Sequence, residues 1–213
     1  MKTFEYWKVI GVAGALAGLV AWPGAGQAQL DLGGILPPIL PVPAPTTATG
    51  QASVATASVL GNVTSLVDTG TLTDPSEPLG AGLPIGSIPG LLTAESLHAV
   101  TMGWTDQVAS EASLSNLAMS LAGTGLSADF IQSRALAVSG AVPTGLTSIE
   151  GLTIGGVPVS PVGVPNETLS LAGLSVILNE QIQSASGIVV NALHVTTPDG
   201  LINVVVGSAK AGI

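Results

Sequence analysis

The chain has 213 residues, of which 13 are acidic and 4 basic, giving a formal net charge of −9 and a pI near 4.2. Nucleic acids and anionic membrane surfaces are bound by basic patches, so this composition argues against both as partners. The absence of cysteine excludes disulfides, thiolate metal sites and thiol nucleophiles. Aromatic residues make up only 3% of the chain, which disfavours the stacking platforms typical of a lectin or a glycosidase.

The first 28 residues have the pattern of a secretory signal peptide. Lys2 and Lys8 precede an apolar run at 9–22, and small residues at 26–28 offer a cleavage site. The run has 14 residues, whereas a helix needs about 20 to span a bilayer, so a permanent membrane anchor is the less favoured alternative. We therefore expect a signal helix at 1–28, cleavage after Ala28, and no membrane span in the mature chain.

Residues 29–52 are predicted to form a proline-rich linker. Five prolines lie between Leu30 and Pro45, which favours an extended or polyproline II segment over a helix or an inner strand. The folded domain is expected to cover residues 53–213. It begins with a strand in the alternating segment 52–66.

The next 70 residues are less regular. Repeated prolines and glycines at 71–90 predict a long irregular connection, the natural place for a binding surface. Strands are expected at 91–105 and 126–138. Segment 106–123 fits either an amphipathic helix ending near Gly123 or a strand, and we favour the strand. A turn is expected at 140–145.

The stretch from Gly151 to the end predicts successive β-hairpins. A two-residue Gly155-Gly156 loop would pair Ile154 with Val157 and Leu152 with Val159, so that all four share one face. Pro158 would then lie opposite Thr153 at an edge.

The same arithmetic predicts two further hairpins. A turn at Ala172-Gly173 would pair Leu171 with Leu174 and Leu169 with Val176. The run Thr197-Pro198-Asp199-Gly200 predicts a turn that joins strands at 188–195 and 201–206. Both strands are apolar on each face, so they are expected to be central and covered on each side. We expect an all-β domain, an antiparallel β-sandwich of about 8–10 strands, with a β-solenoid as the alternative.

Four short runs in the second half also resemble a known family: Pro165–Thr168, Leu178–Gln181, Val190–Val195 and Val204–Ala209. Their order and spacing are similar to those of the choice-of-anchor P family, and residues 96–103 and 110–113 resemble its first half. The resemblance covers about 53–213 and implies an extracytoplasmic bacterial or archaeal domain of unestablished role. The C-terminal Lys210-Ala211-Gly212-Ile213 has no sorting motif or apolar tail, so no C-terminal anchor is expected.

His98 and His194 are the only histidines. Each lies in a similar short run, Ser96–Ala99 and Ala192–Val195, so a duplication could bring them together on paired strands. With Glu111 or Glu180 they would then form a metal or acid–base site. The alternative, which we favour, is that they are separate strand residues, because they lack a close-spaced metal motif.

Asn179, Glu180 and Asn191 interrupt apolar strands and are predicted to form a polar clip that fixes strand register. A bolder hypothesis joins Lys210, the sole lysine of the mature chain, to an asparagine through an isopeptide bond promoted by Glu180.

These observations predict a secreted, periplasmic or cell-surface module that is not an enzyme and uses no cofactor. Its partner would be a protein or a cell-envelope component, and exposed strand edges allow self-association. The alternative function is a metal-dependent or hydrolytic enzyme that uses His98 and His194.

Overall fold

The computed structural model describes residues 48–73, 78–171 and 173–213. Within them the chain forms β-strands and no helix, so no described helix is long and apolar enough to cross a membrane. The strands are β1 (Thr49–Val59), β2 (Asn62–Asp68), β3 (Leu79–Ile88), β4 (Leu92–Gly103), β5 (Gln107–Leu121), β6 (Thr124–Val138), β7 (Thr144–Glu150), β8 (Thr153–Ile154), β9 (Val157–Pro158), β10 (Glu167–Leu171), β11 (Leu174–Gln183), β12 (Gly187–Thr196) and β13 (Ile202–Gly212).

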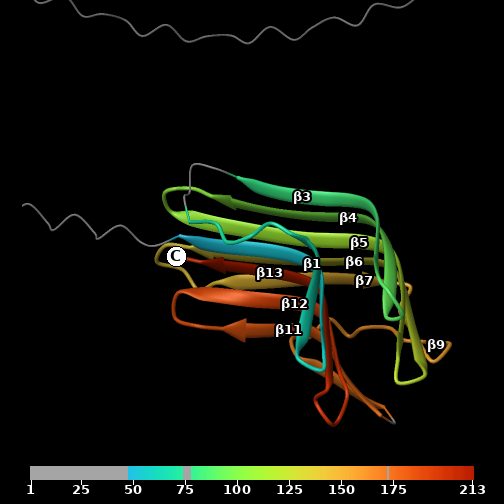
Figure 1. Ribbon diagram of the computed structural model, residues 1–213. Helices are drawn as coiled ribbons and strands as arrows, with labels where there is room; N and C mark the ends of the chain where they lie inside the picture. Colours follow the sequence, from blue (N-terminus) through green and yellow to red (C-terminus); the bar gives the residue numbers. More distant parts are fainter. Residues whose placement is uncertain (1–47, 74–77, 172) are drawn as a thin grey trace, which may run out of the picture. The chain divides into compact units, whose positions relative to one another are not determined.

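These strands form two antiparallel sheets that pack face to face (Figure 1). Sheet A has the order β10-β11-β12-β13-β1-β2, and sheet B has the order β3-β4-β5-β6-β8-β9, with β7 beside the other half of β6. The all-β sandwich prediction is confirmed, and the solenoid is not what forms. The described strands outnumber the expected eight to ten because several short strands are added at the edges.

The predicted signal helix at 1–28 and most of the proline-rich linker at 29–52 lie outside the described residues. β1 starts at Thr49, a few residues ahead of the expected domain start at 53, and its first residues already pair with β13.

The predicted hairpins form with the expected registers. Ile154 pairs with Val157 and Thr153 with Pro158, and β9 is an edge strand. Leu152 and Ile154 are buried, but Val157 is 64% exposed, so the predicted burial of all four residues is wrong for Val157. This strand has only two residues and lies at the end of the sheet, where no facing strand covers it.

The two later hairpins are also confirmed. Leu171 pairs with Leu174 and Leu169 with Val176, as the turn spacing predicted. Thr196 pairs with Asn203 across the last turn, and β12 and β13 lie in the middle of sheet A. Their inner faces are buried, but their outer faces carry most of the partly exposed residues, so the predicted cover on both sides is wrong. The described chain forms two layers only, and no further layer lies over the outer face of sheet A.

Two predictions about the first half are wrong. Segment 52–66 is two strands, because Leu60 and Gly61 both adopt positive φ and close a tight turn between β1 and β2. The predicted irregular connection at 71–90 contains the ten-residue strand β3. Its proline, Pro84, is tolerated because β3 is an edge strand, where one side of the backbone has no ladder partner.

Segment 106–123 is a strand, as favoured, and Ala122-Gly123 closes a hairpin to β6 through positive φ at both residues. The strand predicted at 126–138 is confirmed as β6. The expected turn at 140–145 is followed by an unpredicted strand, β7, which pairs with β6.

The core between the sheets is built from small aliphatic side chains and divided by a layer of hydroxyls. A larger cluster includes Leu114, Ile131 and Leu193, and a smaller one at the end where β1 begins includes Val108 and Ala211. Buried Thr101, Ser110 and Ser133 are the hydroxyl-bearing residues of the inner faces. The Thr101 hydroxyl bonds that of Ser110, which donates to the Lys210 carbonyl at 2.6 Å and so links the two sheets.

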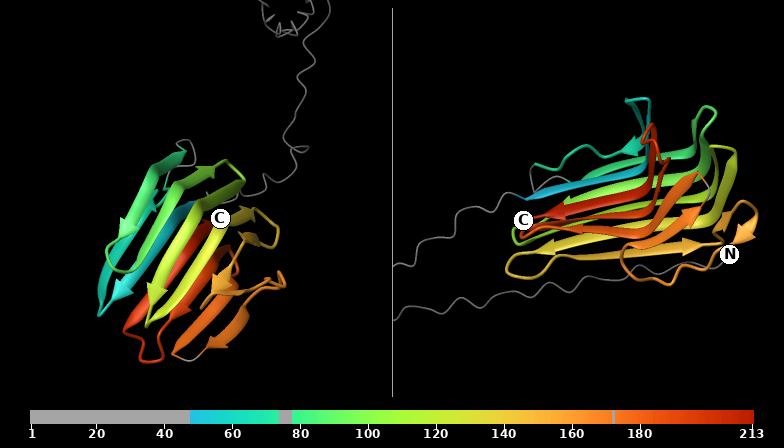
Figure 2. Two further views of the ribbon diagram at one scale, coloured as in Figure 1. Left: turned by 90° about the vertical axis from the view of Figure 1, so that its right-hand side faces the viewer. Right: turned by 90° about the horizontal axis from the view of Figure 1, so that it is seen from below.

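Both sheets bend sharply, as the strands show in Figure 1 and Figure 2. In sheet A the ladder skips one residue on each of five neighbouring strands, a line that we name crease A: Val67, Val54, Gly207, Ala192 and Asn179. Sheet B has a similar line, crease B: Pro84, Ser96, Asn116, Asp129 and Gly151. It is less regular than crease A, because the ladder between β4 and β5 shifts register twice near this line. Positive φ at three members of each line bends the strands as a β-bulge does.

Candidate functional site

Crease A places predicted polar residues together on the outer face of sheet A. Because Ala192 and Leu193 both point into the core, Asn191 and His194 point outward from either side of the crease. Glu180, opposite Asn191 on β11, reaches both of them. Its Oε2 accepts a hydrogen bond from Asn191 Nδ2 at 2.6 Å and lies 2.9 Å from His194 Nδ1. We call these three residues the Glu180 clip.

The Glu180 clip is largely shielded from water. The side chains of His194 and Glu180 are 17% and 14% exposed, and Asn191 is 6% exposed. Such charge-assisted bonds are stronger than neutral ones. Among the described residues, Asn191 Oδ1 and His194 Nε2 are buried without a partner. Glu180 therefore orients the His194 ring through Nδ1, but the other ring nitrogen, Nε2, is buried and not accessible to a substrate.

Asn179 has a separate structural role at the same crease. It adopts a positive φ of 51°, a conformation that asparagine tolerates better than most residues. Its Nδ2 donates to the Gly163 carbonyl at 3.2 Å, and its Oδ1 accepts from Gln181 Nε2 at 2.9 Å. The backbone carbonyl of Asn179 also accepts from Asn166 N–H at 2.8 Å. These bonds fasten the loop before β10 to β11.

Lys210 lies on the same outer face and makes no hydrogen bond to the clip. It pairs with Gln51 on one side and Val189 on the other, and its side chain is exposed. Within the described chain it makes no ion pair. It lines a shallow polar hollow of about 450 Å³ together with Asn191 and Asp68. The isopeptide hypothesis stays a prediction, and the exposed position of Lys210 does not favour it.

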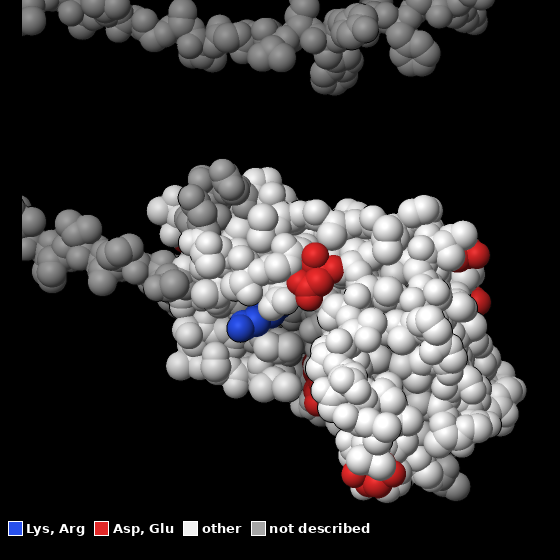
Figure 3. All heavy atoms as spheres, viewed as in Figure 1, with Lys and Arg blue, Asp and Glu red and all other residues white. Residues whose placement is uncertain are grey.

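Charges are sparse on this side of the molecule. In Figure 3 one basic group lies close to an acidic one, and most of the visible surface is uncharged. Asp68, at the end of β2, accepts from Gln51 Nε2 at 3.1 Å and from the Gly70 N–H at 2.6 Å. Both carboxylate oxygens of Asp68 thus already accept hydrogen bonds from other residues of the chain.

The two histidines lie in different sheets. His98 is on β4 of sheet B, where it is exposed opposite Gly82 and Ser113. His194 is on β12 of sheet A. Glu111 is paired with Arg134 and Glu180 with His194, so neither carboxylate joins the two imidazoles. No group of three or more His, Cys, Asp or Glu side chains in the described part of the chain is placed to hold a metal ion.

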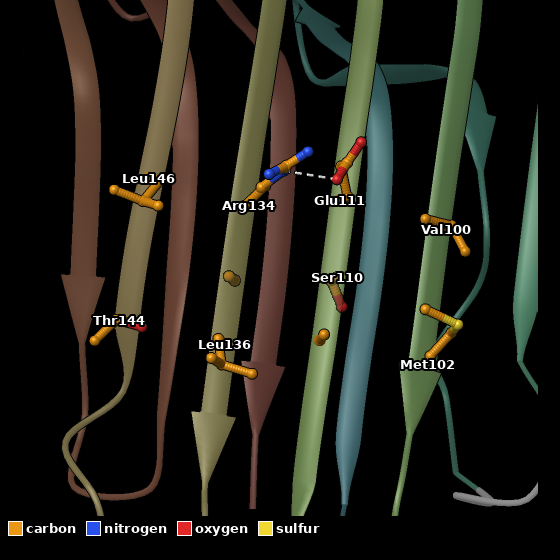
Figure 4. A pocket seen from close by; sticks show the side chains of 10 residues that line it. Val100, Met102, Ser110, Glu111, Arg134, Leu136, Thr144 and Leu146 are labelled. Atoms are coloured by element: carbon orange, nitrogen blue, oxygen red, sulfur yellow. Dashed lines mark hydrogen bonds and ion pairs between the residues drawn. The ribbon is translucent and has the colours of Figure 1, made fainter.

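A hollow of about 320 Å³ lies on the outer face of sheet B, on strands β4 to β7 (Figure 4). At one end of it lies Arg134, whose Nε donates to Glu111 Oε2 at 2.7 Å. Gln132 Nε2 also donates to Glu111, at 2.9 Å. The other lining residues are Val100, Met102, Ala109, Ser110, Ala135, Leu136, Thr144 and Leu146.

The apolar members of this hollow are unusually open to solvent. Met102 is 37%, Leu136 38% and Leu146 68% exposed, and Trp104, at the end of β4, is 42% exposed. Arg134 has five N–H donors, of which the described residues use one, at Nε. A half-exposed guanidinium among aliphatic side chains suits a ligand that brings both an apolar group and a carboxylate.

Asp199, in the turn between β12 and β13, is the one titratable group among the described residues whose pKa is clearly shifted. Hydrogen bonds from the Thr197 hydroxyl at 2.6 Å and the Leu201 N–H at 3.0 Å lower the pKa of Asp199 below its ordinary value. The carboxylate is fully exposed, so it shapes the turn rather than a site.

The sequence predicted a polar clip of Asn179, Glu180 and Asn191 but not the hollow. Glu180 and Asn191 stood out because they interrupt apolar runs, and His194 stood out as one of only two histidines. The hollow depends on four strands lying in register, which no local pattern specifies. The weak signal was the row of outward polar side chains Gln132 and Arg134 on β6, followed by apolar Leu136 on the same face.

Comparisons with protein-family models, curated proteins and solved structures return no match to this chain. The resemblance to the choice-of-anchor P family stays a prediction.

Proposed function

We propose that this chain is a secreted or envelope-associated, non-enzymatic interaction module that binds a protein partner on the outer face of sheet B. The observation that carries the proposal is the hollow lined by Arg134, where exposed aliphatic side chains and a guanidinium with unused donors line the same surface. Export is supported by the basic, apolar and small-residue order of the first 28 residues.

The composition of this surface is that of an interface core. Arginine, methionine and tryptophan are enriched in protein–protein interfaces. Single exposed leucines are common on protein surfaces, whereas a group of exposed apolar side chains often marks a binding site. The partner would place an apolar side chain against Met102, Leu136 and Leu146 and a carboxylate on Arg134. Glu111 already holds one side of the guanidinium, so the ordering cost of the arginine is reduced before the partner arrives.

The enzyme alternative requires His98 and His194 to cooperate. They lie on different sheets, and His194 Nε2 is buried. No observation favours this second function.

A photo-crosslinking side chain at Leu146 tests the proposal. The exported chain carrying it would be incubated with the envelope fraction of the source cells, and a crosslinked protein would be identified and purified. Val63, 67% exposed on sheet A against 68% for Leu146, is a matched control position.

The expected result is one product from position 146 and none from position 63. The purified partner should then bind the unmodified chain, and an Arg134→Glu change should weaken that binding by tenfold or more. Equal products from both positions, or binding unaffected by Arg134→Glu, would overturn the proposal.

A further inference from the structure

Strand β3 presents a long edge that no described strand pairs with. It has ten residues and ends sheet B, with β4 on one side only. From Leu79 to Ile88 it contains no charged residue, and Ile85 is 69% and Leu83 44% exposed. Among the described residues, no side chain bonds the free edge of β3. Proteins usually protect such edges with charges, prolines, bulges or a covering segment, because an open edge pairs with other strands. Of these devices β3 has one proline, Pro84, at a single irregular position of its ladder, and the residues on either side of it keep their N–H groups.

The edge on the opposite side of the sandwich is covered. There, Gln183 Nε2 donates to the Pro143 carbonyl at 2.7 Å and Gln181 Nε2 to the Gly145 carbonyl at 3.2 Å, so β11 side chains satisfy the backbone at the start of β7. Gly145 lets these elements approach, since a Cβ there would lie 2.4 Å from Val190 Cγ2. β9 has only two residues, one of them proline.

The shape of β3 limits what can pair with it. The strand crosses crease B at Pro84, where its ladder with β4 is interrupted opposite Ser96. A straight strand would follow only one half of this bent edge. A strand with the same bend in its middle can follow both halves, and β3 of a second copy, running antiparallel, has that bend.

The order of core-facing and exposed residues along β3 also suits pairing with a second β3 related by a two-fold axis. Leu83 lies opposite buried Leu97, and Gly86 points to the core, since a Cβ there would lie 2.8 Å from Leu97 Cδ2. Exposed Gly82 and Ser87 lie opposite exposed His98 and Thr93. In a register centred between Pro84 and Ile85, Leu83 faces the second Gly86 and Gly82 the second Ser87. Core-facing residues then meet core-facing ones, as side chains opposite each other in a sheet must.

We propose that two copies of this chain pair through β3 in an antiparallel, two-fold arrangement centred between Pro84 and Ile85, joining two seven-stranded sheets into one. The missing N–H of Pro84 falls at the crease, where the ladder is already interrupted. Among the described residues, Glu95 on β4 is the acidic residue that pairs with β3, opposite Ile85. Two copies of it would lie three strand spacings apart, about 14 Å, beyond the Debye length of about 8 Å at physiological salt.

Sedimentation velocity of the exported chain over a range of concentrations tests the pairing. The native chain should form a dimer, and Ile85→Lys should shift it to monomer by at least tenfold in dissociation constant. Val157→Lys, on the opposite edge of sheet B and 64% exposed, should leave the dimer unchanged. A native chain that stays monomeric, or a dimer insensitive to Ile85→Lys, would overturn the proposal. Far-UV circular dichroism of each variant checks that it folds.

Single cysteines in this cysteine-free chain test the register. Ile85→Cys lies beside the axis and should form an intermolecular disulfide under mild oxidation. Ser87 of one copy faces Gly82 of the other, so the two Ser87 residues are offset by five positions along the paired strands, a distance of about 16 Å. The two sulfurs of Ser87→Cys should therefore not form a disulfide. Disulfides from both variants, from Ser87→Cys alone, or from neither would contradict the antiparallel register. This surface is separate from the hollow lined by Arg134, so either proposal can fail without the other.

Discussion

The outer faces of the two sheets differ in how far their polar side chains are buried and hydrogen-bonded within the chain. On sheet A, Glu180 bonds Asn191 and His194 across crease A, and little of the three side chains is exposed. On sheet B, Arg134 and Glu111 pair in the open beside exposed Leu136 and Leu146. The first arrangement uses its donors and acceptors mainly to hold strands together. The second leaves donors and apolar surface unused, which is why we assign binding to sheet B and structural support to the clip.

The largest expected effect is on the clip. Replacing Glu180 with alanine removes the acceptor shared by Asn191 and His194 and leaves two poorly solvated donors unpaired, at about 1–3 kcal/mol each. We expect urea unfolding to show a loss of about 2–4 kcal/mol.

The matched control is Glu111→Ala on sheet B, where the ion pair is more exposed and a loss of at most about 1 kcal/mol is expected. Equal losses from the two alanine variants would remove the contrast between the faces.

Leu146→Asp should separate binding from stability. Leu146 pairs with Arg134 across β6 and β7, so an aspartate there would occupy the guanidinium and add charge to the hollow. We expect partner affinity to fall by tenfold or more, measured by titration calorimetry with the protein captured at this face. The unfolding free energy should change by less than about 0.5 kcal/mol, as for most exposed substitutions. A fully retained affinity would place the binding surface elsewhere.

Asn179 tests how crease A is built. Asn179→Ala loses two side-chain bonds and leaves a residue with a β-carbon at positive φ. Asn179→Gly loses the same bonds but adopts that backbone conformation freely. The alanine variant should therefore be less stable than the glycine variant by about 1 kcal/mol in denaturant unfolding. If the two variants are equally stable, positive φ at this position does not set the bend.

The smallest expected effect is the pH dependence of stability that comes from Asp199, a fully exposed carboxylate. The lowered pKa of Asp199 means that its ionised form is favoured in the folded turn. Its contribution is present above the unfolded pKa of about 3.9 and is lost as the pH falls through the lower folded value. The unfolding curves of native chain and Asp199→Asn should differ slightly at pH 6 and converge in acid. A difference that grows in acid would contradict this assignment.

Much of the second half of the fold could be predicted from sequence because local signals agreed there. Gly155-Gly156 and Thr197–Gly200 set turn positions, and alternating aliphatic residues set the register. β3 was missed because its glycines and Pro84 are typical of loops, and only the edge position allows them in a strand. β7 was missed because Pro143 and Gly145 suggested a continuing turn.

The two creases explain why side-chain faces were harder to predict than strands. A simple alternation fails wherever one residue per strand leaves the ladder, as at Asn179 on β11 and Asn116 on β5. Glu180, Asn191 and His194 could be named from the sequence, but their meeting required the crease. The hollow had only a weak signal on β6, since its residues come from four strands aligned by long-range pairing.

Methyl NMR spectra of the chain, recorded with and without its captured partner, test the division between the two faces most directly. Binding should shift the methyl resonances of Met102, Leu136 and Leu146 and leave those of Ile177 and Val205, beside the clip, in place. Shifts confined to Ile177 and Val205 would contradict the assignment of binding to sheet B.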